Sequence, residues 1–265
     1  MASENTTLAT CWKLTRSDNV VMGFTDHDKD LVIDGITYES STGFTPTAIA
    51  SGSSLSSDDL EVNGILDSSS IEEKDIMAGI YDYAQIEIFL VNHQDLTQGK
   101  LYMRKGRFGE VTLQNKRFTA EVRGLVDSYR QTIGELYSPS CRAILGDTKC
   151  AVNLAPFTVS GTITSVTSNR VFEDNSRSEQ AGWFSGGKIT FTSGNNAGLK
   201  MEVKEVGLGG DVILVLPMPY NVQVGDTYTM VAGCDKTFAT CKAKFSNAVN
   251  FRGEPHVPGT DKMLK

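Results

Sequence analysis

Four of the five cysteines in this chain fall into two pairs, and this pattern constrains the fold more than any other feature. Eight residues separate Cys141 from Cys150, and six separate Cys234 from Cys241. More than eighty residues lie between the pairs, so the fold has to bring distant segments together to make one four-thiolate site. Nearby cations lower the pKa of a thiol and offset the negative charge of a metal–thiolate centre. The cations that flank the pairs are Arg142, Lys149, Lys236, Lys242 and Lys244.

The spacing indicates four ligands without identifying the metal. It lacks the two-residue clip of zinc ribbons and the C-x2-C-x2-C run of bacterial ferredoxins. Two disulfides, or buried cysteines that act as small apolar side chains, are the alternatives. The N-terminus shows no basic stretch followed by an apolar one, so we expect a protein made in a cytoplasm, where thiols stay reduced. That environment favours a metal over disulfides.

The composition is that of a soluble globular protein, with 40% hydrophobic and 22% charged residues among 265. No apolar run approaches the roughly 20 residues that span a bilayer, so we expect no stable membrane insertion. The net charge of −7 argues against a surface that binds nucleic acid. An acidic wall is nevertheless compatible with a lumen through which DNA passes without sticking.

Residues 1–133 are predicted to form a β region. The dipeptide Asp34-Gly35 between two β-prone runs predicts a hairpin. Residues 70–79 are the clearest helix, with Ser70 as N-cap and Gly79 at the end. A helical signal returns in residues 126–136. The expected strands are 7–15, 20–25, 31–33, 36–39, 60–66, 84–92, 100–106, 107–113 and 117–126.

Residues 159–231 are predicted to form a small inserted β-barrel or sandwich, because short strands alternate with glycine-rich and proline-rich turns. Its flanks would be a first cysteine connector, residues 134–158, and a second one with a C-terminal tail, residues 232–265. The last twenty residues are expected to be extended. The expected strands are 159–167, 188–191, 200–206, 211–216 and 227–231.

Other candidate sites are better explained as structure. The run Asp26-His27-Asp28-Lys29-Asp30 has Leu31 and Thr37 where a calcium loop needs glycine and glutamate, so we expect a solvated turn. The loop at residues 193–198 lacks a following helix and is expected to join two strands rather than bind phosphate. Cys11 is expected in the core. The histidines, His27, His93 and His256, form no recognisable catalytic motif, and we expect no enzyme.

Four stretches of sequence carry a resemblance to a known family. They are residues 23–31 (GFTDHDKDL), 86–92 (IEIFLVN), 137–150 (YSPSCRAILGDTKC) and 234–259, which includes NFRG and P-H-x-P-G. Over nearly the whole chain they resemble the tail-tip or baseplate hub proteins of siphophages and of the Rhodobacter gene transfer agent. The cysteine spacings are also similar to those of the tail-tip protein L of phage lambda, which is known for an iron–sulfur cluster. The two pairs lie further apart here than in that protein.

The resemblance implies a structural protein of the virion tail tip, assembled in the cytoplasm of a bacterial host. It implies a homotrimeric ring that joins the distal tail protein to a central tip or fibre protein and continues the DNA channel, with the tape measure protein as a further neighbour. Residues 1–133 would supply two tube-like β modules. The ligands of a 4Fe-4S cluster, with zinc as the runner-up, would be Cys141, Cys150, Cys234 and Cys241.

Two other classes of function are weaker. A stand-alone iron–sulfur or zinc enzyme, or a redox carrier, would share the cysteines, but the C-x3-C-x2-C run of a radical enzyme is absent. A cell-wall hydrolase would need a catalytic Cys–His pair, for which the sequence has no signature. Binding to neighbouring tail proteins, as opposed to turnover of a substrate by the isolated chain, would separate a hub from either enzyme.

Overall fold

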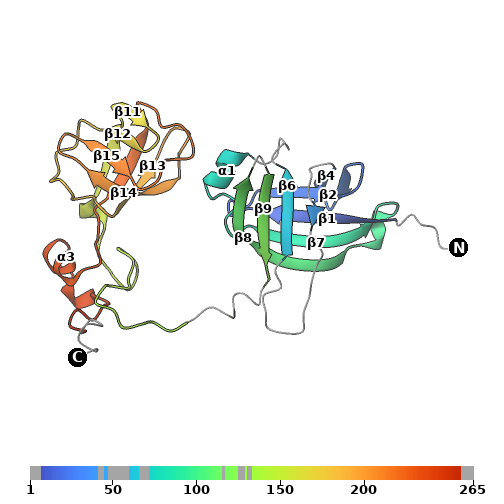
Figure 1. The fold of residues 1–265 in the computed structure, drawn as a ribbon, viewed down its shortest axis with the longest axis horizontal. Coiled ribbons are helices and arrows are strands. Elements are labelled where there is room, and N and C mark those ends of the chain that lie inside the picture. Colours follow the sequence, from blue (N-terminus) through green and yellow to red (C-terminus); the bar gives the residue numbers. More distant parts are fainter. Residues whose placement is uncertain are drawn as a thin grey trace. The chain divides into compact units, whose positions relative to one another are not determined.

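The computed structural model describes residues 7–40, 45–46, 60–65, 72–114, 117–124, 129 and 133–257. Contacts divide the chain into two compact units, Met1–Ile133 (unit 1) and Gly134–Lys265 (unit 2), both drawn in Figure 1. Each unit is built around one β-sheet, so the mainly β fold predicted from the sequence is confirmed. Within the described part, no helix has the length and apolar character needed to cross a bilayer.

Unit 1 is a nine-stranded sheet with the order β3-β4-β2-β1-β7-β8-β9-β6-β5. Figure 1 shows that this sheet curls rather than lying flat. The pair β2 and β4 is parallel, and every other neighbouring pair is antiparallel. The strands are β1 (Leu8–Thr15), β2 (Val21–Thr25), β3 (Leu31–Ile33), β4 (Ile36–Ser40), β5 (Thr45–Pro46), β6 (Leu60–Ile65), β7 (Gln85–Asn92), β8 (Leu101–Gln114) and β9 (Arg117–Arg123).

The sheet of unit 1 buries apolar side chains on both faces. Successive side chains of a strand point to opposite faces, so Cys11 and Trp12 belong to different clusters although both are buried. The larger cluster includes Trp12 and Phe108, and the smaller one includes Cys11 and Phe89. The turn after helix α1 (Glu73–Met77) packs Ile80 against the larger cluster. The described strands of this region, where two β modules are expected, all belong to one sheet.

Local predictions in unit 1 succeeded where turn chemistry was strong. Asp34 and Gly35 have φ of 52° and 78°, and the strands on either side pair from Ile33 to Ile36, as a two-residue hairpin requires. Helix α1 is shorter than predicted and begins after Glu72, which makes no side-chain cap, instead of after Ser70. Gly79 ends it with a φ of 69°.

Two other predictions in unit 1 need correction or remain open. The strands expected at 100–106 and 107–113 are one 14-residue strand, β8, because its register shifts at bulges instead of breaking. Most of the helix expected at 126–136 lies outside the described residues, and residues 133–136 are not helical.

Unit 2 contains a seven-stranded antiparallel sheet with the order β10-β16-β13-β14-β15-β12-β11. Its first and last strands are consecutive in the chain, and only Ile163 and Thr164 join them. Three Cα steps reach roughly 11 Å, so the end of β10 lies close to the start of β11 and the sheet has to curl round as in a barrel. The strands are β10 (Thr158–Thr162), β11 (Ser165–Ser168), β12 (Val171–Glu173), β13 (Gly187–Phe191), β14 (Lys200–Val206), β15 (Asp211–Leu214) and β16 (Thr227–Val231).

The barrel of unit 2 encloses its own apolar core, whose largest side chains include Phe172, Phe184, Phe191 and Tyr228. The sequence predicted one strand at 159–167, and this is wrong. The chain turns inward at Ile163, which is 1% exposed and donates its N–H to Asp226 O. This turn separates β10 from β11 and sends them to opposite edges of the sheet. The loop at residues 193–198 joins β13 to β14, as predicted.

The remaining parts of unit 2 are the cysteine segments, residues 134–157 and 232–257. They contain α3 (Phe238–Ala243), which the sequence analysis missed, and the short turns η2 (Ala155–Phe157) and η3 (Ala248–Asn250). A further such turn, η1 (Leu96–Gln98), lies in unit 1. Strands β10 and β16 pair from Thr158 to Val231, and Ala232 N donates to Phe157 O at 2.9 Å. The barrel therefore delivers both cysteine segments side by side.

Candidate metal centre

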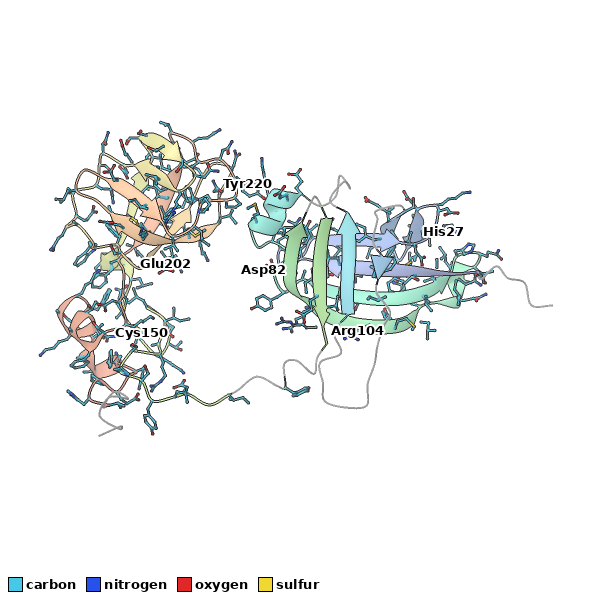
Figure 2. The ribbon with its side chains drawn as sticks, in the orientation of Figure 1. His27, Asp82, Arg104, Cys150, Glu202 and Tyr220 are labelled. Atoms are coloured by element: carbon cyan, nitrogen blue, oxygen red, sulfur yellow. The ribbon has the colours of Figure 1, made fainter. Side chains whose placement is uncertain are left out.

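The four paired cysteines line a single pocket between the two cysteine segments. Cys141 and Cys150 lie in turns of the first segment, Cys234 follows β16, and Cys241 lies in α3. Figure 2 labels Cys150 among the turns beside this helix. All five cysteines of the chain are free thiols, so neither disulfide of the alternative interpretation is present. The structure thus gathers the four predicted ligands around one space.

Backbone hydrogen bonds between the segments hold the pairs together. Cys141 N donates to Lys236 O at 2.8 Å, which ties the first pair to the loop that carries Cys234. Arg142 N donates to Arg252 O at 3.0 Å. Within the first pair, Asp147 accepts from Cys150 N at 2.6 Å and from Ile144 N at 2.9 Å through its two carboxylate oxygens. These bonds lower the pKa of Asp147.

Three residues without the freedom of glycine adopt left-handed backbone conformations around this pocket. They are Ala151, with a φ of 56°, Lys236, with 64°, and Ser246, with 50°. Each follows a cysteine closely or, in the case of Ser246, ends the turn after α3. Such conformations are costly and persist only where the surroundings enforce them, commonly at functional sites. They allow tight turns that keep the thiols directed at one pocket.

Burial and mutual repulsion act on the thiols. Cys150 and Cys241 are each 8% exposed, and Cys141 and Cys234 are half-buried. Burial raises the pKa of Cys241, and the nearby charges of the other three cysteines raise it further. Four thiols that repel one another when ionised are stable as thiolates only with a cation between them.

Within the described part of the chain, no group of three or more His, Cys, Asp or Glu side chains is arranged to hold a metal ion. Tetrahedral zinc holds sulfurs about 2.3 Å from the metal and hence roughly 3.8 Å from each other. A cubane cluster places several irons and sulfides between its thiolates and spaces them more widely. The four donors are all sulfur, which suits either group.

Amide groups reach the sulfurs directly. Arg252 N lies 3.4 Å from Cys141 Sγ and donates to it. Asn247 Nδ2 lies 3.7 Å from Cys150 Sγ and 2.6 Å from Cys150 O. The Cys241 thiol donates to Asn247 O at 3.4 Å. The donors on Arg252 and Asn247 stabilise charge on sulfur in the way that the second shell of a metal site does.

Two of the flanking cations identified in the sequence bind backbone carbonyl oxygens. Lys236 donates its Nζ to Ala143 O across the two segments. Lys244 donates to Trp183 O and to Gly233 O, and its Nζ lies 4.4 Å from the centre of the Trp183 ring. Burial lowers the pKa of Lys244, although the charges of Cys234 and Asp235 oppose this. Lys244 therefore docks α3 on the barrel.

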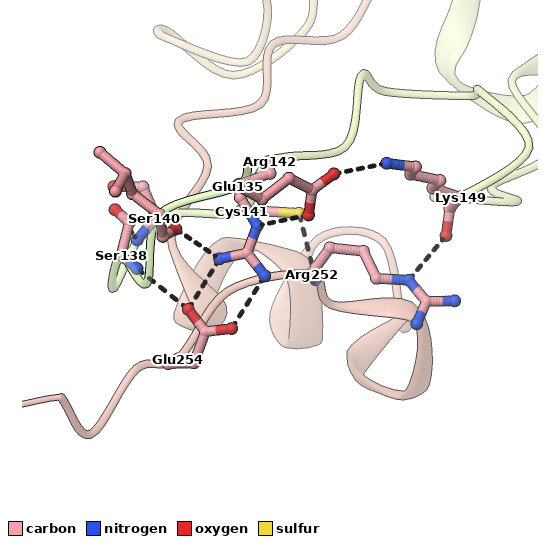
Figure 3. A network of polar contacts seen from close by, with 9 residues as sticks. Glu135, Ser138, Ser140, Cys141, Arg142, Lys149, Arg252 and Glu254 are labelled. Atoms are coloured by element: carbon pink, nitrogen blue, oxygen red, sulfur yellow. Dashed lines mark hydrogen bonds and ion pairs between the residues drawn. The ribbon is translucent and has the colours of Figure 1, made fainter. Parts of the chain in front are cut away.

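A clasp of charged residues closes the outer side of the site (Figure 3). Arg142 makes a bidentate ion pair with Glu254, at 2.7 and 2.8 Å. Glu135 bridges Arg142 and Lys149, at 3.1 and 2.7 Å. Glu254 also accepts from Ser138 N at 3.0 Å, and these bonds, led by the one from Arg142, lower its pKa to about 2. The clasp binds the C-terminal tail to the start of unit 2.

The tail therefore departs from the extended form that the sequence predicted, at least as far as residue 257. Glu254 N donates to Ser138 O at 2.8 Å, so the tail runs back along the first cysteine segment. A Cβ atom at position 253 would lie 2.6 Å from Ser140 O, and only glycine permits this approach. Residues 258–265 lie outside the described part of the chain.

The other motifs singled out in the sequence are structural. The turn at residues 26–30 follows β2, where Asp26 accepts from Thr10 N and Asp30 accepts from Ser40 N, at 2.7 and 2.8 Å. The ring of His27 packs on that of His93, with centroids 4.4 Å apart. Cys11 is fully buried in unit 1, as predicted, and burial is the main cause of its raised pKa.

Three residues that contact the site have no role predicted from the sequence. Asn247 and Arg252 donate to sulfur, and Glu254 holds the clasp. All three lie in the last twenty residues, whose prolines and glycine suggested a free tail. The available signal was their position just after the second cysteine pair, within reach of a site that the cysteines already defined.

Comparisons with known proteins agree across both units. A family model described as the N-terminal attachment domain of baseplate hub proteins matches residues 1–153, and one described as a conserved hypothetical phage protein matches residues 182–261. A chain in the solved virion of a native gene transfer agent particle is 37% identical, with a TM-score of 0.83. That match covers 99% of this chain and 92% of the other. No curated protein matches.

Loss of the clasp should release the tail. Because Glu254 has its pKa lowered to about 2 from 4.5, its charge stabilises the folded tail above about pH 4.5, and that stabilisation is lost as the pH falls towards 2. At pH 7 we expect Glu254→Gln and Arg142→Lys to speed hydrogen exchange of the Glu254 amide several-fold, since lysine cannot make the bidentate pair. Glu87→Gln, which removes the ion pair with Lys105 in unit 1, is the control. Unchanged exchange in both clasp variants would show that the tail is held without the clasp.

Proposed function

Because this chain belongs to the family of baseplate hub proteins, and is thus a structural protein of the virion tail, we propose that it forms the hub ring at the tail tip. The observation that carries the proposal is the match over almost the full length to a chain of the gene transfer agent virion, at 37% identity and a TM-score of 0.83. The ring is a homotrimer that joins the distal tail protein to a central tip or fibre protein. The tape measure protein is a further neighbour.

Unit 1 has the features of a ring-forming part. Strand β3 is at the edge of its sheet, and Val32 on that strand is 61% exposed. An exposed edge is a liability in a monomer but serves as a joint in a closed ring. Further apolar side chains lie exposed at the start of β8, where Leu101, Tyr102 and Met103 are 63%, 49% and 48% exposed. Neighbouring subunits or tail proteins would cover such a surface.

The ring continues the channel of the tail tube. A basic wall would hold DNA through its phosphates and release of counterions, whereas a polar, acid-leaning wall lets it slide. The net charge of −7 supports such a lining. The function is therefore to join, seal and open a conduit, and it needs no catalytic residue.

The same proposal assigns a 4Fe-4S cluster to Cys141, Cys150, Cys234 and Cys241, with zinc as the runner-up. Support comes from the pocket that all four line, from their free thiols and from the two amide donors at sulfur. When bound, the cluster supplies a covalent crosslink between the two cysteine segments. The chain orients the thiols, donates to them and covers them with the tail.

Measurement of iron, sulfide and zinc in anaerobically purified protein identifies the cofactor. We expect a brown protein with close to four irons and four sulfides per chain, whose visible absorption bleaches on reduction. A colourless protein with one zinc per chain would retain the site and overturn the iron assignment. A protein with neither metal would remove the centre from the proposal.

Loss of a ligand should be structural in effect. Cys141→Ser and Cys241→Ser should lose the metal and at least about 3 kcal/mol of the unfolding free energy of unit 2, because metal binding to such a site is also folding free energy. Cys11→Ser is the matched control, since a serine can keep the hydrogen bond to Thr25 and the residue lies in unit 1. Metal content and thermal unfolding measure both effects. Equal damage from Cys11→Ser would refute the separation of ligands from the core cysteine.

Cryo-electron microscopy of intact tails tests the ring. We expect three copies around an open channel at the tail tip, with unit 1 at the joints and few lysines or arginines on the channel wall. Six copies in an ordinary tube ring, or a position in a peripheral fibre, would contradict the hub assignment.

A further inference from the structure

Asn247 contacts both cysteine pairs at once. Its backbone binds Cys241, because Asn247 N donates to Cys241 O at 3.0 Å, a bond that persists when Cys241 is a thiolate. Its side chain binds Cys150, with Nδ2 at 2.6 Å from Cys150 O and 3.7 Å from Cys150 Sγ. It thus links a cysteine of each pair across more than eighty residues of sequence.

The orientation of the Asn247 amide is fixed from its other end. Asn250 donates its Nδ2 to Asn247 Oδ1 at 2.7 Å, so the oxygen of Asn247 is occupied and its nitrogen faces Cys150. Asn250 N also donates to Asn247 O at 3.1 Å, at the start of η3. Ser246, with a φ of 50°, turns the chain after α3 and places Asn247 at this point. A left-handed conformation at a residue other than glycine indicates that the position of Asn247 is enforced.

A donor fixed beside a thiolate changes its chemistry in a defined direction. It stabilises negative charge on the sulfur, and a reduced cluster carries more negative charge than an oxidised one. The hydrogen bond therefore stabilises the reduced cluster more than the oxidised one, and this difference raises the reduction potential. The same hydrogen bond opposes dissociation of the ligand, as outer-shell partners do in other metal sites.

We infer that Asn247 is the positioning residue of the thiolate centre, setting the reduction potential and the lifetime of its cluster through Cys150 and fixing the two pairs to each other. This inference rests on the cluster assigned in the proposed function. Asn247 ligates nothing itself. It acts through Cys150 and Cys241, and its effect is therefore separable from loss of a ligand.

Two substitutions in the full-length chain test the inference. Asn247→Asp keeps the size of the side chain but replaces the donor with a carboxylate, and Asn247→Ala removes the donor without adding charge. We expect both to shift the midpoint potential to more negative values, the aspartate variant further. Release of iron to a chelator should be about tenfold or more faster in Asn247→Asp.

The control is Asn196→Asp in the barrel. Asn196 is fully buried, and its side chain donates to Tyr220 O at 3.0 Å and accepts from Tyr220 N at 3.2 Å. The Asn196→Asp substitution should lower thermal stability and leave the midpoint potential of the cluster unchanged. Wild-type potential and iron release in both Asn247 variants would overturn the inference, as would the same shift in Asn196→Asp. A wild-type protein without iron would instead overturn the cluster of the proposed function.

Discussion

The pairing of β10 with β16 is the contact on which the rest of unit 2 depends. These strands begin and end the barrel, and their antiparallel register from Thr158 to Val231 brings the two ends of a long insertion together. The hydrogen bond from Ala232 N to Phe157 O continues the ladder by one step. The entropy of closing this loop is offset by the barrel's own core, so the cysteine pairs meet without a disulfide between them.

The barrel sets where the cysteine segments start, and local turns determine where the thiols point. Lys244 anchors α3 to the barrel through Trp183 O and Gly233 O, while stacking of its charge on the Trp183 ring adds a contact that an uncharged residue would lack. Beyond α3, the tail returns over the site and is held by Glu254. The last described residues of the chain are therefore part of the centre.

Sequence reasoning worked where a short pattern determines its own geometry. Asp34-Gly35 gave the hairpin because only a few residues tolerate two successive left-handed conformations. The cysteine spacing gave the candidate ligands because thiols have few other reasons to occur in pairs. Prediction from the sequence failed where the local structure depends on contacts with distant residues. Ile163 interrupts a run of β-prone residues because Asp226, far along the chain, accepts its N–H, and Asn247 gains its role only from Cys150.

The sheets of the two units differ in where their edge strands lie. The sheet of unit 2 curls until β10 and β11, its first and last strands, are joined by only Ile163 and Thr164, whereas the sheet of unit 1 ends at β3. The cysteine segments contain no strand among their described residues, so no sheet holds them together. Among their described residues, the buried apolar side chains are Ala143, Cys150, Ala232, Cys241 and Phe245. So small a core does not hold two segments together, and folds of this size are commonly stapled by disulfides or a metal. Four thiols around one pocket, none of them paired, place the candidate staple where packing is weakest.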